Sequence, residues 1–486
     1  MSAKTLRQTF YLFLAAALLG VALHTRTREA NAMPMFARRY GVPCSTCHTS
    51  PPRLNEVGYK FRAAGFRMPE EVGKIPEELS KVKILNHIGF RLQPRLDVLR
   101  SESGGVSETH SKGTLFAAEA YIWYGPINRY FGSNLKVTIY PDEGFETEDE
   151  ERVEGNIRFT YGNQDGWLDL RAGVPHPMEG FGGSEYYVIA NSRPFIQELR
   201  SAFFNQNTFF GPITYHQAGL TMAYHHKKTT IRGVITPGIR LKIDEKTDTL
   251  QAFGRKEPFT HAIPQHNEGG PDVQLFFNQI LHPNGGNVSV YFYDGRSHLP
   301  RLDMANPMNH PTTPEFTPQM AGLFASNGIR PLATAGLSSE ALPHTDALTR
   351  EEEANALAQI PWFKNHFNRL AFYTGYPIKR LSLLFGIQGG RDAIGSGGHF
   401  TSLGHFTEAN VKLFNDISVI GARYDWFDPA RNLDQNEMKG FTAYMNLWLH
   451  SELRVTPEYQ HLVFNRGVGQ NKLTQDRFQI RLYWIR

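Results

Sequence analysis

The chain has 486 residues, of which 41% are hydrophobic and 20% are charged, and its mean hydropathy is −0.39. It contains 34 Phe, 20 Tyr and 44 Gly, and no long apolar run follows residue 24. This composition argues against an ordinary soluble enzyme. It is typical of a transmembrane β-barrel, in which only every second strand residue faces lipid.

Residues 1–32 predict a signal peptide. Lys4 and Arg7 precede an apolar stretch from Phe10 to Leu23, and Ala30-Asn31-Ala32 is a small-x-small cleavage pattern. The apolar stretch is shorter than the ~20 residues of a spanning helix, although a retained membrane anchor is the alternative. Cleavage would remove four basic residues and one acidic residue, which lowers the formal net charge from +4 to +1. We therefore expect export, and no nucleic-acid partner.

The chain has two cysteines, and both lie in the motif Cys44-Ser45-Thr46-Cys47-His48. Two thiols three positions apart can bond to the two vinyl groups of one haem, and the adjacent His then ligates the iron. A zinc site would need two further ligands, and a thioredoxin-like redox pair would need a βαβ context. The motif predicts one covalent haem c held by Cys44, Cys47 and His48.

The residues after the motif predict a short helix that begins at Ser50-Pro51-Pro52 and stops at Gly65. Its apolar residues have helical spacing, and we expect that face to cover the haem: Leu54, Val57, Phe61 and Ala64.

Met68, just past this helix, is the first candidate for the second axial iron ligand. Met33 and Met35, a barrel-borne His, or an open site are the alternatives.

A haem module of about fifty residues is too small to shelter the haem by itself. We expect it to occupy residues 33–80 and to borrow the rest of its pocket from the remaining chain.

Residues 81–486 predict an antiparallel transmembrane β-barrel of about 16 strands. The segments 156–161 and 167–171 flank an Asp-Gly turn, and apolar residues alternate at 273–277 and 288–292 around Pro283–Gly286. Further pairs are expected at 369–376 with 380–388 around Pro377, 411–414 with 417–426, and 441–450 with 453–464, and an alternating strand is expected at 218–224.

The final strand carries alternating apolar residues up to Trp484, which suits a barrel that closes with its last strand. The small helical haem module would plug the lumen. A secreted β-sandwich is the alternative fold. Residues 296–365 are rich in Pro, Asn and Thr and predict a long loop, outside the cell or folded into the pore.

The residues around the haem motif are similar to those of a known family. Met33–Cys44, Leu54–Gly58, Phe61 and Ala64–Arg67 resemble the fused monohaem cytochrome c–porin family, which includes the outer-membrane iron-oxidising cytochromes of iron-oxidising bacteria. The specific resemblance covers about residues 33–70. It implies a haem held at or within a barrel. It also implies electron transfer from extracellular ferrous iron to a periplasmic c-type cytochrome or copper protein.

Together these features predict a bacterial outer-membrane electron conduit, with an iron:cytochrome c oxidoreductase as the possible enzyme class. Three alternatives remain open at this point. They are a passive porin with a tethered periplasmic cytochrome, a haem enzyme such as a peroxidase or nitrite reductase, and a conduit that exports electrons to extracellular acceptors.

Overall fold

The structure is a computed structural model of the whole chain. It describes residues 34–74, 87–140, 150–173, 189–198, 219–236, 242–244, 249–252, 255–257, 271–300, 362–394, 398–413, 418–428, 431, 437–450, 452–465 and 472–485. The predicted signal peptide 1–32 and the predicted domain boundary at residues 80–81 lie outside these ranges. No helix among the described residues is long and apolar enough to cross a bilayer.

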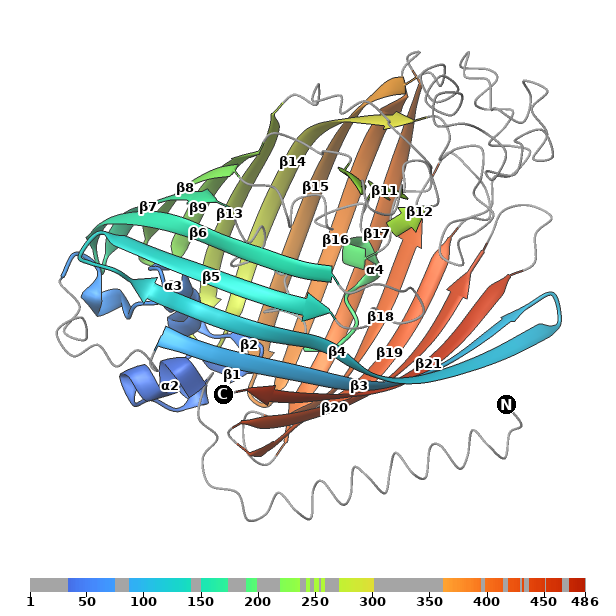
Figure 1. Cartoon of the computed structure of the whole chain (residues 1–486), viewed down its shortest axis with the longest axis horizontal. Helices are drawn as coiled ribbons and strands as arrows, with labels where there is room; N and C mark the ends of the chain where they lie inside the picture. The colour runs from blue at the N-terminus through green and yellow to red at the C-terminus, as the bar shows by residue number, and fades with distance from the viewer. Residues whose placement is uncertain are drawn as a thin grey trace.

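Sixteen antiparallel strands form a closed barrel in which each strand pairs with its neighbour along the chain (Figure 1). The last strand pairs with the first, and β9 pairs with β13, so the described ring has no free edge. The barrel strands are β3 (Ile88–Ser103), β4 (Val106–Pro126), β5 (Phe131–Tyr140), β6 (Glu150–Asn163), β7 (Gly166–Gly173), β8 (Gly219–His226), β9 (Thr229–Thr236), β13 (Asp272–His282), β14 (Gly286–Pro300), β15 (Trp362–Ile378), β16 (Leu381–Ile394), β17 (Gly398–Lys412), β18 (Val419–Asp428), β19 (Met438–His450), β20 (Leu453–Phe464) and β21 (Leu473–Ile485).

Short elements precede the barrel and lie at one of its ends (Figure 1). These are α2 (Pro34–Tyr40), the 3-10 turn η1 (Cys44–Thr46), a hairpin of β1 (His48–Ser50) and β2 (Arg53–Leu54), α3 (Glu56–Ala63) and the 3-10 turn η2 (Pro69–Glu71). Two further pieces follow β7 and β9: α4 (Phe195–Glu198), and a three-stranded sheet of β10 (Lys242–Asp244), β11 (Thr249–Ala252) and β12 (Arg255–Glu257).

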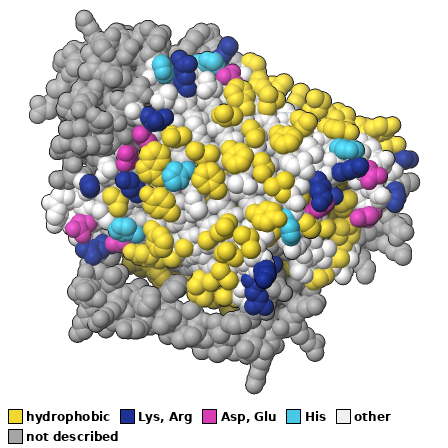
Figure 2. All heavy atoms as spheres, turned by 180° about the vertical axis from the view of Figure 1, so that it is seen from behind, with side chains coloured by type: hydrophobic (Ala, Val, Ile, Leu, Met, Phe, Trp, Pro, Cys, Tyr) yellow, Lys and Arg dark blue, Asp and Glu magenta, His cyan; other side chains and the backbone are white. Residues whose placement is uncertain are grey.

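The strands alternate between an apolar outer face and a polar inner face, as their sequences predict. On β8 the side chains of Leu220, Met222 and Tyr224 are exposed on the outside, whereas Thr221 and Ala223 are buried inside. Apolar side chains cover much of the outer surface that Figure 2 shows. Such a surface is stable in lipid, and closure leaves no strand edge unpaired there.

The two ends of the barrel differ in their connections. Two-residue turns at 164–165, 227–228, 379–380 and 451–452 all lie at the end where β3 begins and β21 finishes. Most connections at the opposite end are longer, and the one between β14 and β15 spans 301–361, although β3 and β4 join there through a two-residue turn at 104–105. Short turns are typical of the periplasmic end of an outer-membrane barrel, and long loops of the extracellular end.

Three local predictions are wrong. The helix begins at Glu56 rather than at Ser50–Pro52, because Asn55 is the N-cap and its side chain accepts a hydrogen bond from the Gly58 N–H at 3.0 Å. Val57 is exposed, because this later start turns it away from the buried face. Pro377 pairs with Ser382 inside the sheet, and the turn falls at Lys379-Arg380.

The predicted long loop is shorter at both ends. Residues 296–300 belong to β14 and residues 362–365 to β15, where they pair with one another. Residues 301–361 lie outside the described part of the chain. The hairpin at 156–171 and the strands at 273–292, 441–464 and 473–485 are confirmed.

Introducing a charged side chain on the outer face of the barrel tests whether that face contacts lipid. Leu370 lies in the middle of β15, and 58% of its surface is exposed. We expect Leu370→Arg to lower the free energy of unfolding in lipid vesicles by about 2–4 kcal/mol, because a guanidinium near the bilayer midplane loses hydration. Urea unfolding measures the change. Leu370→Ile is the control, expected to cost less than about 1.5 kcal/mol; equal effects would contradict the assignment.

Candidate functional site

The haem motif forms a tight loop that α3 holds in place. The Cys47 N–H donates to the Cys44 carbonyl at 3.1 Å, and the Cys47 carbonyl accepts from the Asn55 N–H at 3.0 Å. The Asn55 side-chain amide also donates to the carbonyls of Ser45 and Thr46 at 3.1 and 3.0 Å. Asn55 therefore caps α3 and fixes the segment between the two thiols.

Gly58 lets α3 approach this loop closely. A Cβ at this position would lie 2.1 Å from the Cys47 carbonyl oxygen, which is far inside van der Waals contact. A larger residue would push the helix away from Cys47. The glycine is thus needed for the packing of α3 on the motif.

Burial controls the ionisation of the three motif side chains. Cys44 is fully buried and Cys47 half-buried, and neither forms a disulfide. Burial raises the pKa of the Cys44 thiol to about 12 and that of Cys47 to about 11. Burial lowers the pKa of His48 to about 4, more than the nearby carbonyls of Pro52 and Arg53 raise it. Both thiols are therefore protonated at neutral pH and the imidazole is neutral.

The residues fit a covalently bound haem c. The two thiols are reduced, and neutral imidazole is the form that ligates iron. The Nδ1 atom of His48 is buried and has no hydrogen-bond partner among the described residues. A buried nitrogen without a partner is costly unless a ligand satisfies it.

Aromatic rings form the interior of the residue 34–74 segment, which we call the N-terminal module. Phe61 makes an edge contact with Phe36 at 5.0 Å between centroids and with Tyr40 at 5.6 Å, and Phe36 stacks on Phe66 at 5.4 Å. The predicted burial of Phe61 and Ala64 is confirmed.

Met68 and His48 lie next to different strands of the barrel. Met68 immediately precedes η2, and its N–H donates to the Glu71 side chain at 3.1 Å. η2 packs against α3 and β6, whereas His48 lies within electrostatic range of Arg454 on β20. Cys44, Cys47 and His48 are brought together, and Met68 lies beyond the C-terminal end of α3, where η2 contacts β6.

The N-terminal module is docked across the short-turn end of the barrel. On one side Asn446 of β19 donates to the Pro51 carbonyl at 2.6 Å. Thr49 and the Glu56 N–H donate to the turn after β13, at the carbonyls of Asn284 and Pro283. On the other side the side chains of β6 and β7 contact the C-terminal end of α3. The module thus contacts several separate parts of the ring at this end.

Arg158 of β6 provides a further buried contact. Its guanidinium donates to the carbonyls of Arg62 at 3.2 Å and Ala63 at 2.7 Å. It also pairs with Asp169 of β7 at 2.8 Å, with both side chains almost completely buried. Arg158 therefore links the last turn of α3 to the barrel wall.

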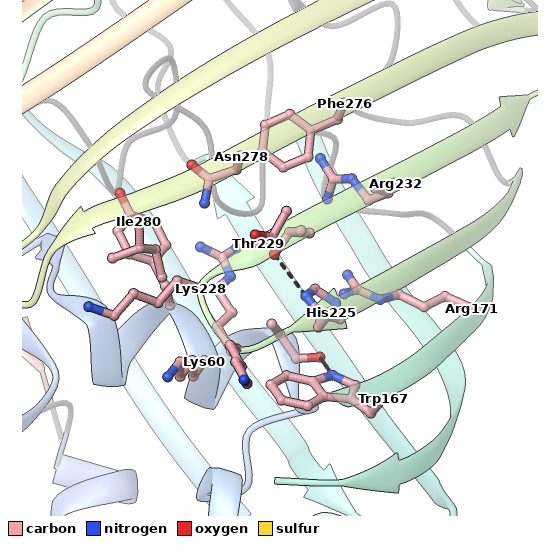
Figure 3. A pocket seen from close by; sticks show the side chains of 15 residues that line it. Lys60, Trp167, Arg171, His225, Lys228, Thr229, Arg232, Phe276, Asn278 and Ile280 are labelled. Carbon is pink, nitrogen blue, oxygen red and sulfur yellow. Dashed lines mark hydrogen bonds between the residues drawn. The ribbon is translucent and has the colours of Figure 1, made fainter. Parts of the chain in front are cut away.

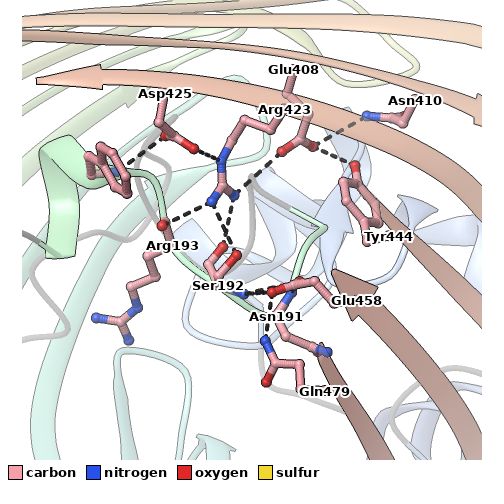
Figure 4. A network of polar contacts seen from close by, with 11 residues as sticks. Asn191, Ser192, Arg193, Glu408, Asn410, Arg423, Asp425, Tyr444, Glu458 and Gln479 are labelled. Atoms are coloured by element: carbon pink, nitrogen blue, oxygen red, sulfur yellow. Dashed lines mark hydrogen bonds and ion pairs between the residues drawn. The ribbon is translucent and has the colours of Figure 1, made fainter. Parts of the chain in front are cut away.

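A second segment, residues 189–198, is held against the inner wall of the barrel by polar contacts (Figure 4). Arg423 of β18 donates to the carbonyls of Ser192 at 2.8 Å and Arg193 at 3.0 Å, and it pairs with Asp425 at 2.8 Å. Glu458 of β20 accepts from the Asn191 N–H at 2.6 Å. Phe195 and Ile196 then pack on buried aromatic residues of the wall, so residues 189–198 narrow the lumen.

Sequence reasoning missed Arg158, Asp169, Arg423 and Glu458. A charged residue at an inward position of an alternating strand was the available signal, because such a residue must find a partner in the lumen. Which partner it finds depends on packing that the strand pattern does not determine.

Comparison with known proteins finds similarity at the level of structure. No protein-family model matches this chain, and no curated protein is similar to it in sequence. An anion-selective porin from Comamonas acidovorans has 7% identity and a TM-score of 0.48, covering 82% of this chain and 99% of the porin. Outer-membrane expressed OmpT of Vibrio cholerae has 10% identity and a TM-score of 0.44, covering 82% and 97%. OprB of Pseudomonas putida has 11% identity and a TM-score of 0.43, covering 84% and 96%.

The architecture of the chain itself defines its class. A closed ring of sixteen antiparallel strands with an apolar outer face and a polar lumen is the form in which β-structure crosses a membrane. The protein is a porin-like β-barrel of the bacterial outer membrane. Its lumen carries a docked N-terminal module that bears the Cys44–His48 motif.

Removal of the Arg158 guanidinium tests the docking of the module. We expect Arg158→Gln to lower the free energy of unfolding by about 3–5 kcal/mol, because it leaves the buried Asp169 without this partner. It should also make residues 34–74 more sensitive to limited proteolysis. Arg100→Gln is the matched control, because its ion pair with Glu102 is exposed and worth about 0–1 kcal/mol. Identical stabilities of the two variants would contradict this role.

Proposed function

We propose that the protein conducts electrons across the outer membrane through one haem c in its N-terminal module. The observation that carries the proposal is the position of the Cys44–His48 motif. The motif lies in a module docked across the end of a transmembrane pore, with β19 and the turn after β13 on one side and β6 on the other. A redox group attached there is held inside the ring rather than beside it.

The chain would hold the haem through thioether bonds from Cys44 and Cys47 and through the His48 imidazole as a ligand to the iron. When bound, the haem supplies one-electron redox chemistry. The surrounding chain excludes water: the aromatic cluster of Phe36, Tyr40, Phe61 and Phe66 fills the module, and the barrel wall covers its flanks. We propose Met68 as the second ligand, which requires η2 to shift toward the motif.

Ferrous iron is the proposed donor, and a periplasmic c-type cytochrome or copper protein is the proposed acceptor. Both follow from the resemblance of residues 33–70 to the fused monohaem cytochrome c–porin family. The docking of the module at the short-turn end, which is typical of the periplasmic side, supports acceptor access there. The reaction would be that of an iron:cytochrome c oxidoreductase, and the same path would serve for electron export.

A passive porin is the second candidate function, and the closed polar-lined barrel favours it. The docked module and the segment 189–198 both obstruct the lumen, which favours conduction of electrons over diffusion of solutes.

Absorption spectroscopy of the purified protein tests the haem and its donor. We expect a c-type haem spectrum that survives acid–acetone extraction and is reduced by ferrous iron. The double variant Cys44→Ser/Cys47→Ser should abolish covalent attachment, because it removes both thioether bonds, whereas Ser45→Ala should leave the spectrum unchanged. A haem that stays oxidised with ferrous iron would contradict the donor, and the lack of covalent haem would contradict the proposal.

Planar bilayer recording separates the conduit from the porin. We expect the full-length protein to show single-channel conductance far below that of an open sixteen-strand porin measured in the same salt, because the module and residues 189–198 fill its cross-section. A conductance equal to that of the open porin would favour the passive porin.

A further inference from the structure

A pocket lies at the seam between α3 and the barrel wall (Figure 3). α3 contributes Tyr59, Lys60 and Arg62, and the wall contributes side chains of β7, β8, β9, the β8–β9 turn and β13. The pocket opens to solvent, and its empty space with that open part included is about 550 Å³. The residues of the haem motif are not among those that line it.

The lining of the pocket is strongly cationic. It contains six Lys and Arg side chains and, among the described residues, no Asp or Glu: Lys60, Arg62, Arg171, Lys227, Lys228 and Arg232. Two carboxylates lie just outside. Glu56 pairs with Lys60 at 2.7 Å and with Lys228 at 3.6 Å, and Asp169 pairs with Arg171 at 2.5 Å. Within the described part of the chain, these two carboxylates therefore lie beside six cationic side chains.

Two buried polar groups of the lining lack a partner among the described residues. They are the Tyr59 hydroxyl and the Nε2 atom of His225, whose side chains belong to residues only 6% exposed. The other ring nitrogen of His225 is already hydrogen-bonded to the Thr230 hydroxyl at 2.9 Å. Burial raises the pKa of Tyr59 to about 12, so the phenol keeps its proton and can donate. A buried polar group without a protein partner needs another one, and a bound ion or water can supply it.

We propose that this seam pocket binds a tetrahedral oxyanion, either free inorganic phosphate or the phosphoryl group of a small solute. Arg62 of α3 and Arg232 of β9 approach from different elements, and guanidinium groups bind phosphate oxygens with paired donors. The Tyr59 hydroxyl adds a neutral donor that a tetrahedral anion can use at the same time. Because its donors come from both α3 and the wall, the bound anion would also join the module to the barrel.

Calorimetric titration of the purified full-length protein in detergent tests this site. Inorganic phosphate is the first titrant, glycerol 3-phosphate distinguishes a phosphoryl group on a solute, and sodium chloride at equal ionic strength controls for screening. We expect Tyr59→Phe to weaken phosphate binding about tenfold, because it removes one donor to a charged ligand. Arg232→Gln should weaken it more.

Arg369→Gln is the matched control, because Arg369 is equally buried in the lumen but lies on β15, outside the pocket. It should bind phosphate as the unmodified protein does. Absence of binding at millimolar phosphate, or equal loss in Arg369→Gln and Arg232→Gln, would overturn the proposal. If Arg232→Gln does not fold, unchanged affinity of Tyr59→Phe overturns it alone. The haem spectrum is recorded in parallel, so failure of this site is distinguishable from failure of the haem assignment.

Discussion

The structure depends on one constraint, which is that a strand in lipid must have both of its edges hydrogen-bonded. Water is absent from the bilayer core, so each unpaired N–H or C=O would cost several kcal/mol. Pairing of β21 with β3 and of β9 with β13 meets this requirement for the described ring. Closure also creates an interior, and the contents of that interior distinguish this barrel from an empty pore.

The interior is positively charged. Among the described residues, twelve buried Lys and Arg face seven buried Asp and Glu. Ion pairs such as Arg158–Asp169 and Arg423–Asp425 use the carboxylates to hold the module and the segment 189–198. The remaining positive charge opposes the entry of cations, which suits passage of electrons better than passage of ferrous iron, and it favours anionic groups such as haem propionates or an oxyanion.

Much of the fold could be predicted from the sequence, because a barrel strand must alternate apolar and polar residues; β8 and β21 show this directly. The positions of the turns were harder to predict from the sequence. Pro377 signalled a turn, but it sits two residues before the turn, where the sheet tolerates it. The Cys44–His48 motif could be singled out from the sequence because its residue types and spacing suggest a specific chemistry, and its haem stays a prediction. The contacts of Arg158 and Glu458 could not be singled out, because they join residues about 95 and 267 positions apart in the sequence.

The complete burial of Cys44 has a consequence for biogenesis. A reagent or enzyme that modifies this sulfur cannot reach it in the folded state, and its raised pKa leaves almost no reactive thiolate. Any covalent chemistry at Cys44 must therefore occur on the nascent exported chain, before the first seventy or so residues seat in the ring. For the proposed haem, this burial would require attachment to come before barrel assembly.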